Sequence, residues 1–482
     1  MFRNYYIIFA AENTYIKNTT MTVSRKSERV VSIDVLRGIA IFGMILCGQI
    51  GWHSGLPAWM FHAQLPPPDY VFNPEVRGIT WVDLVFPFFL FSMGAAFPFA
   101  MNKKISKGAG KGEIVFGLLK RWFTLMVFSL VAGNAYRIPS AGISPVLANL
   151  MTIAVWGALF LALTRFRFKK NAANTAMNLA GVLLIAGIGL TISLLPGGEI
   201  SREYSDVIIM ILGYVSLFGG LIWLLTRNSH KARWCVFGII LAIKAAASYR
   251  PEIFSFMPSL QGIGWIFSFS FLQYLLIAIP GSIVGDMILA RKNEKASENG
   301  KESVTAAAVC LIALVFQLWG LFTRHIAADA AFTLCAAAAV LFLTYRRKSL
   351  WTDIAALGFI ILLAGILFDP IDGGIRKDYC NISYLLVTSG MATIATGVLI
   401  FLETAYGMRF KALSECGQNP MIAYTVTGFI TLPVLSLTRL TPVIDSLAYG
   451  SPVMGICRGL LLTFIMMGVT VFFTRKKLFW KS

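Results

Sequence analysis

The loop between the first two apolar segments of this chain carries residue types suited to proton transfer. His62, one of only four histidines, lies in AWMFHAQLPPPDYVF, residues 58–72. Asp83 follows in GITWVDLVFPFFLFSMG, near the start of the second apolar segment. A carboxylate that orients an imidazole makes it a better general base. His62 is the histidine nearest to Asp83 by topology, and His53 is its competitor for this role.

A second interpretation of these residues involves no catalysis. His62 would then be an ordinary loop histidine, and Asp83 a helix-capping or interfacial acid. The residues by themselves leave both interpretations open. In either case Pro66, Pro67 and Pro68 would stiffen the loop, because proline fixes φ and removes an N–H donor.

Asp34 and Arg37 form another candidate pair, in SIDVLRG at the start of the first apolar segment. Three residues apart on a helix, they share a face and can form an ion pair. Charged groups at the centre of a membrane helix cost about 2.5–3.5 kcal/mol, which makes them functional candidates. The pair either anchors the helix at the lipid headgroups, or Arg37 helps to bind an anionic ligand from the cytoplasm.

Membrane-spanning helices would have to position these residues. Of the 482 residues, 57% are hydrophobic and 13% are charged, whereas soluble domains have about 25% charged residues. Apolar runs long enough to cross a bilayer recur throughout, so we expect an all-α, polytopic integral membrane bundle of about 10–14 transmembrane helices. The candidate spans lie near 34–52, 80–101, 114–135, 143–164, 176–196, 204–226, 233–249, 264–290, 303–323, 326–345, 350–368, 382–405, 420–438 and 453–473.

The distribution of basic residues predicts the orientation. With the N-terminus in the cytoplasm and the spans alternating, 31 of the 42 Lys and Arg residues fall on the cytoplasmic side. This asymmetry predicts two cytoplasmic termini, an even number of spans and an outward-facing His62 loop. It also accounts for the net charge of +19, so the lipid bilayer is the expected partner and nucleic acid is not.

The chain is expected to hold one membrane domain. We predict a single transmembrane, acyltransferase-like domain over residues 31–475, with a cytoplasmic N-terminal segment at 1–30 and a cytoplasmic tail at 476–482. Residues 1–20 fit a start-site artefact equally well, because Met21 opens a basic stretch. The seven cysteines lack CxxC and metal-ligand spacing, so neither a disulfide framework nor a metal site is expected.

Several motifs, taken together, resemble those of one protein family. They are SIDVLRGIAIFGMIL, WMFHA, TWVDLVFPFFLFSMG, LQYLLIAIPGSIVGDM, GGIRKDYCNISYLLVTSGMA and LSECGQNPMIAYT, in this order along the chain. Each is weak singly, but the set resembles the heparan-alpha-glucosaminide N-acetyltransferase family of transmembrane acetyltransferases, above all its uncharacterised bacterial members. The resemblance implies a protein of a bacterial inner membrane.

The resemblance implies an activity as well. The family takes the acetyl group of cytoplasmic acetyl-CoA and places it on an amino sugar, a terminal glucosamine of a glycan, across the membrane. In the family pattern, His62 matches the active-site histidine and Asp83 the acid of D-L-V-F-P. His62 would act as the base or as a transient acetyl carrier. Arg37, with Asp34 beside it, would suit the phosphates of CoA.

Other site residues are assigned more loosely. The family often has an asparagine late in the first helix, where this chain has Gly48 and then Gln49, so Gln49 is expected to substitute as a polar substrate contact. Lys377 and Asp378 could contact a sugar from the outer face, or could be solvated loop charges. Asn419 either caps a helix or belongs to the CoA entrance.

A transporter for a sugar or glycan fragment is the alternative function. The even number of spans and the Gly/Pro-interrupted stretch AIPGSIVGD fit that class. A transporter should tolerate His62→Ala, whereas the enzyme should not. The sequence leaves open the acceptor, N- versus O-acetylation and the oligomeric state, for which a homodimer is one option.

Overall fold

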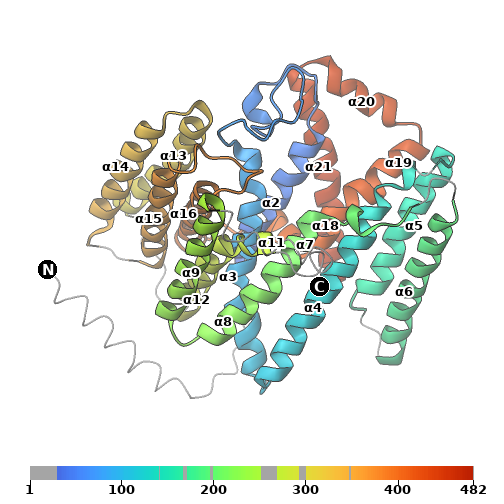
Figure 1. Cartoon of the computed structure of the whole chain (residues 1–482), viewed down its shortest axis with the longest axis horizontal. Helices are drawn as coiled ribbons and strands as arrows, with labels where there is room; N and C mark the ends of the chain where they lie inside the picture. Colours follow the sequence, from blue (N-terminus) through green and yellow to red (C-terminus); the bar gives the residue numbers. More distant parts are fainter. Residues whose placement is uncertain are drawn as a thin grey trace. The chain divides into compact units, whose positions relative to one another are not determined.

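Long helices dominate the part of the chain that the structure, a computed structural model, describes (Figure 1). This part comprises residues 30–140, 142–166, 171–195, 199–250, 269–291, 300–346 and 349–480. Its long uninterrupted helices are α2 (Val31–Gln49), α3 (Val85–Ile105), α4 (Lys111–Ala135), α5 (Pro145–Leu163), α6 (Asn171–Ser193), α9 (His230–Tyr249), α12 (Leu275–Ala290), α13 (Lys301–Thr323), α14 (Ile326–Thr344), α15 (Leu350–Phe368), α16 (Ile382–Tyr406) and α21 (Pro452–Arg475).

Two further spans are helices interrupted by a π-helical turn. The first consists of α7 (Val207–Tyr214), the π turn η5 (Val215–Gly219) and α8 (Gly220–Thr226). The second consists of α18 (Pro420–Val426), the π turn η8 (Thr427–Thr431) and α19 (Leu432–Leu437). The short helices α11 (Phe269–Leu272), α17 (Lys411–Gln418) and α20 (Thr441–Gly450) complete the set.

The prediction of a polytopic helical membrane protein is confirmed. Within the described ranges, fourteen segments are long and apolar enough to cross a membrane. This number stands at the upper end of the predicted range. The predicted N-terminal segment, residues 1–30, lies outside the described residues except for Val30, as do Lys481 and Ser482 of the predicted tail.

Helix α16 forms the most enclosed part of the bundle. In its most apolar stretch 89% of the residues are buried, against 6% in α9. Helix α16 packs against α15, α12, α2 and α3. The exposed apolar side chains of α9, such as Ile239 and Ile243, suit contact with lipid tails.

Glycines allow the central helices to approach one another closely. A Cβ on Gly281 of α12 would lie 2.3 Å from the carbonyl oxygen of Phe91 in α3. On α2, a Cβ on Gly38 would lie 2.0 Å from the carbonyl oxygen of Leu413 in α17. Small residues serve the same purpose in membrane bundles generally, where close backbone contact drives helix association. These contacts hold α2, α3, α12 and α17 in one packed group.

The segment between α2 and α3 carries His62. It is irregular apart from short 3₁₀ turns, such as Ala58–Met60. Ile50, Leu56 and Phe61 form a buried cluster in it, and Trp52 and Tyr70 pack against that cluster. Because Phe61 immediately precedes His62, its burial positions the backbone of the histidine.

Candidate functional site

His62 and Asp83 form a hydrogen-bonded pair where the loop meets the start of the second span. The Nδ1 atom of His62 lies 2.6 Å from Oδ1 of Asp83. The Asp83 side chain is fully buried, whereas 27% of the His62 side chain is exposed. An ionised carboxylate can only accept, so we assign the proton to Nδ1. Nε2 then carries a free lone pair and can act as a base.

The backbone around Asp83 fixes the orientation of its carboxylate. Asp83 belongs to the 3₁₀ turn η2 (Trp81–Leu84) ahead of α3, and it forms a capping box with Thr80. Its Oδ2 accepts from the Thr80 N–H at 2.9 Å, and its backbone carbonyl accepts from the Tyr384 hydroxyl of α16 at 2.9 Å. Thr80 Oγ1 donates to the Phe61 carbonyl at 2.7 Å. Asp83 therefore both caps its helix and is hydrogen-bonded to His62, and a catalytic role for the pair stays a prediction.

Lys377 joins this pair from the loop between α15 and α16. Its Nζ lies 3.1 Å from Nδ1 of His62 and 3.8 Å from Oδ1 of Asp83. The ammonium group supplies a positive charge beside the buried carboxylate. We call His62, Asp83 and Lys377 the histidine cluster.

His53 lies apart from this cluster. Its ring packs edge-on against Tyr70, with centroids 4.9 Å apart, and stacks against Tyr449 of α20 at 6.1 Å. The carboxylate of Asp83 is thus paired with His62, the preferred candidate of the sequence analysis.

The remaining residues predicted for the acceptor side have separate surroundings. The carbonyl oxygen of Gln49, at the end of α2, accepts a 2.6 Å hydrogen bond from Nη1 of Arg458. Asp378 is exposed beside Lys377. Cys380 follows on the same loop, and burial raises the pKa of its thiol to about 12, so it remains protonated at neutral pH. Substrate contacts of Gln49, Lys377 and Asp378 stay predictions.

The predicted pairing of Asp34 and Arg37 is confirmed. Nη1 of Arg37 lies 3.6 Å from Oδ1 of Asp34. The guanidinium also donates to the Ser92 carbonyl at 3.0 Å and to the Gly417 carbonyl at 3.2 Å. Arg37 therefore ties α2 to α3 and α17, which favours a structural role for most of its donors.

Arg121 of α4 is a site candidate that the sequence analysis missed, because the basic residue was counted with the cytoplasmic charges. It lines a cavity of about 130 Å³ together with Arg37, and we call this space the arginine cavity. Within the described residues, Nε of Arg121 is buried without a hydrogen-bond partner. A usable signal was its position inside LLKRWFTLM, an apolar stretch where a charge is costly.

A second, apolar cavity extends the arginine cavity along α3. It measures about 20 Å³, and both cavities are lined by Phe89, Leu212, Pro420 and Met421. Along α3 the linings run from Ala100 to Phe86. At 1.5 Å per residue this is about 21 Å of helix. Phe86 is three residues from Asp83 in the sequence, but neither lining includes a residue of the histidine cluster.

Asn419 has a different role from the helix cap considered above. It occupies the N-cap position of α18, but its side chain makes no capping hydrogen bond. Instead, Nδ2 donates to the carbonyl of Leu478 at 2.8 Å. The amide ties α18 to the chain that follows α21, so Asn419 stands at the N-cap position without capping through its side chain. A place for Asn419 in a CoA entrance stays a prediction.

One curated relative shares a limited stretch of sequence with this chain. Heparan-alpha-glucosaminide N-acetyltransferase of Homo sapiens is 28% identical over 119 residues, which are 25% of this chain and 16% of that protein. The chain therefore matches less than a fifth of the length of the human protein. It is distantly similar to a transferase of acetyl groups.

A family profile covers a larger part of the chain. The profile described as "Domain of unknown function (DUF5009)" matches residues 29–288. The match includes α2, the loop that carries His62, and α3. It also includes α4, which contributes Arg121 to the arginine cavity, and most of α12. Since it extends over more than half of the sequence, the chain belongs to the DUF5009 family.

Proposed function

We propose that this protein is a membrane acetyltransferase that uses acetyl-CoA as donor and an amino sugar or glycan fragment as acceptor. The observation that carries the proposal is the His62–Asp83 pair, with its partly exposed imidazole and buried carboxylate. The distant similarity to an N-acetyltransferase supports the same class of reaction.

The histidine cluster supplies the proton transfer that such a reaction needs. An amine that attacks the thioester carbonyl must lose a proton, and Nε2 of His62 accepts it. Asp83 stabilises the imidazolium that results, through the 2.6 Å contact with Nδ1. The new C–N bond forms as the C–S bond breaks, and the proton held by His62 leaves with the CoA thiolate.

A two-step route uses the same atom of the histidine. In that route Nε2 of His62 attacks the thioester, the C–S bond breaks and CoA leaves as the thiolate. The amine then takes the acetyl group as the bond to Nε2 breaks, and the freed Nε2 accepts the proton of the amine and passes it to the thiolate. Both routes require Nδ1 of His62 to face Asp83, and both leave Nε2 free to react. The geometry of the histidine cluster suits each of them.

The arginine cavity suits the binding of the acetyl donor, acetyl-CoA. Arg121 has an unused Nε–H there, and arginine binds phosphate groups through charge-assisted hydrogen bonds. CoA carries its thioester at the end of a flexible arm, remote from its phosphates. The apolar cavity lined by Met44 and Phe86 measures about 20 Å³, room for about one water molecule, so this arm would have to widen it on the way toward Asp83.

The proposal includes an orientation in the membrane. The excess of Lys and Arg on one side supports two cytoplasmic termini, and the resemblance to bacterial members of the acetyltransferase family supports a bacterial inner membrane. The His62 loop would then face the opposite side, where the acceptor is bound. The acetyl group, but not CoA, would cross.

The first test is acetyl transfer by the detergent-solubilised full-length protein. Radiolabelled acetyl-CoA and glucosamine are supplied to wild type, His62→Ala and His53→Ala. His62→Ala is expected to lose a factor of about 10²–10⁴ in rate, the usual contribution of a general base. His53→Ala, a histidine of the same loop outside the cluster, should keep its activity.

Binding of CoA is measured in the same samples. All three proteins should bind CoA equally, because the arginine cavity is unchanged. If wild type neither binds CoA nor transfers label to any amine or hydroxyl, the proposed acetyltransferase activity is refuted. Sugar transport into liposomes that tolerates His62→Ala would favour the transporter instead.

A further inference from the structure

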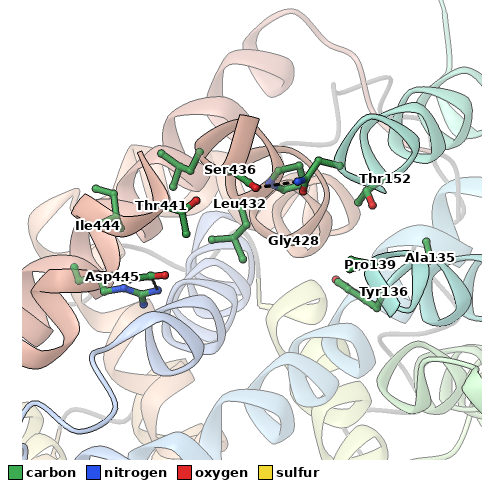
Figure 2. A pocket seen from close by; sticks show the side chains of 14 residues that line it. Ala135, Tyr136, Pro139, Thr152, Gly428, Leu432, Ser436, Thr441, Ile444 and Asp445 are labelled. Atoms are coloured by element: carbon green, nitrogen blue, oxygen red, sulfur yellow. Dashed lines mark hydrogen bonds and ion pairs between the residues drawn. The ribbon is translucent and has the colours of Figure 1, made fainter. Parts of the chain in front are cut away.

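A larger cavity lies apart from the histidine cluster and the arginine cavity. It has a volume of about 380 Å³, within the range of about 300–1,000 Å³ typical of small-molecule sites. Its walls come from the end of α4, the start of α5, the span that contains η8, helix α20 and the first half of α21 (Figure 2). We call it the α20 cavity.

An ion pair forms one wall of the α20 cavity. Nη2 of Arg458 in α21 lies 2.8 Å from Oδ1 of Asp445 in α20 (Figure 2). The Asp445 side chain is 48% exposed, whereas that of Arg458 is 14% exposed. Because Arg458 neutralises Asp445 and is itself partly shielded, the wall offers hydrogen-bonding groups without a strong net charge.

Further polar groups line the cavity. Nδ2 of Asn149 donates to Oγ of Ser436 at 2.9 Å and to the carbonyl of Pro145 at 2.8 Å. Two buried atoms of the lining, Oγ1 of Thr441 and Nε of Arg458, have no hydrogen-bond partner among the described residues. The lining therefore combines donors and acceptors, and some of them remain unused.

An apolar surface accompanies these polar groups. The ring of Tyr136, the pyrrolidine of Pro139 and the side chain of Leu432 lie along the cavity (Figure 2). Tyr136 is supported from behind by an edge-on contact with Phe429, with centroids 4.7 Å apart. A ligand with hydroxyl groups on its rim and C–H groups on its faces matches such a mixture of walls.

Backbone irregularity marks this cavity as well. Gly428, in the π turn η8, is one of its lining residues. Such turns occur frequently at functional sites, because they shift the helix register and open space beside it. A Cβ at Gly428 would lie 2.7 Å from the Tyr136 ring, so glycine is needed for the ring to sit there.

Helix α20 connects the α20 cavity to the His62 loop. Asp445 of this helix faces the cavity, and Tyr449, one turn later, stacks on His53 of the loop. Arg458 of the cavity donates to the carbonyl of Gln49, where the loop begins. The cavity and the histidine cluster are thus on the same side of the bundle.

We propose that the α20 cavity is a saccharide-binding site, which takes an uncharged sugar unit separately from the reacting amine at His62. The ion pair and the hydroxyl groups would bind the sugar hydroxyls, and Tyr136 would pack against the face of the ring. The choice of ligand rests on the proposed function, but binding to the cavity is independent of any donor.

The test measures sugar binding to the full-length protein in a detergent whose head group is not a sugar. The probe is di-N-acetylchitobiose, followed by calorimetry or saturation-transfer NMR in the absence of acetyl-CoA. Thr441→Trp fills the cavity, and Asp445→Asn removes the charge that faces it. Ser446→Trp is the matched control, because Ser446 is an exposed residue of the same helix outside the lining.

Wild type, His62→Ala and Ser446→Trp should bind the disaccharide with equal affinity. Thr441→Trp should weaken binding by about tenfold or more, and Asp445→Asn by a smaller factor, since the amide keeps an oxygen that accepts a hydrogen bond. Melting temperatures show whether each variant is folded. Binding lost in His62→Ala but kept in Thr441→Trp would overturn the proposal, as would a cavity that takes only phospholipid or detergent.

Discussion

The histidine cluster and the arginine cavity differ in how completely the protein satisfies their polar groups. In the cluster, Nδ1–H of His62 donates to Asp83 at 2.6 Å, and the Lys377 ammonium lies 3.8 Å from the same carboxylate. In the cavity, Nε of Arg121 has no hydrogen-bond partner among the described residues. The first region is organised internally, whereas the second retains a donor that an incoming anion can use.

This difference suits a division of labour between the two regions. Proton transfer needs groups held in one geometry before the substrate arrives, because reorganisation adds to the barrier. Binding of the negatively charged acetyl-CoA instead gains free energy from polar groups that find a hydrogen-bond partner only when acetyl-CoA is bound. The two regions should therefore respond to substitution in different kinetic parameters.

The largest effect is expected at the buried acid of the cluster. Asp83→Asn should lower kcat by about 10²-fold or more, because the imidazolium formed at His62 loses its carboxylate partner. The amide oxygen of the asparagine can still accept the hydrogen bond from the Thr80 N–H, so the fold should persist. Steady-state kinetics with labelled acetyl-CoA measure this loss.

Asp69→Asn is the matched control for that variant. Asp69 is an exposed acid of the same loop and should tolerate the change. If Asp83→Asn keeps full kcat with an unchanged melting temperature, the carboxylate only caps α3, and the comparison between the two regions fails.

A smaller effect is expected in the arginine cavity, and on a different parameter. Arg121→Met should raise the KM for acetyl-CoA by about tenfold while kcat changes little, because a charge-assisted hydrogen bond contributes about 1.5–3 kcal/mol. In the absence of acetyl-CoA, the variant should be at least as stable as wild type. The substitution removes a buried N–H group that has no hydrogen-bond partner among the described residues. Kinetics and thermal unfolding are measured side by side.

Lys120→Met provides the control, because Lys120 is exposed on the neighbouring position of α4. Equal KM values for the two variants would remove Arg121 from the donor site. A fall in kcat at constant KM would show that Arg121 acts on the chemistry, and the distinction between the regions would disappear.

The smallest effect is expected at Lys377. Its ammonium group lies 3.8 Å from the Asp83 carboxylate but is 30% exposed, so water screens part of the interaction. Lys377→Met should lower kcat by about twofold to fivefold, an amount that matches a partly screened charge pair of up to about 1 kcal/mol. Arg376→Met, which breaks an ion pair with exposed Glu75 instead, should leave kcat unchanged. An Arg376 variant that is as impaired as the Lys377 variant would assign the effect to the loop and not to the charge.

The sequence by itself determined the features that depend on neighbouring residues. The spans were predictable because the bilayer sets the length of an apolar run, and fourteen spans are present in the described ranges. The Asp34–Arg37 pair followed from helix geometry, since residues three apart share a face. The capping role of Asp83 was also accessible, because its partner Thr80 is three residues away.

Only the tertiary structure decided which distant residues meet. The sequence favoured His62 over His53 as the partner of Asp83 by topology, but only the packing of Phe61 and the position of Thr80 bring His62 within hydrogen-bonding distance. Lys377 and Tyr384 reach Asp83 from about 300 positions away, and Asn419 binds the Leu478 carbonyl instead of capping its own helix. Such contacts depend on how whole helices pack, which no local pattern of residue types specifies.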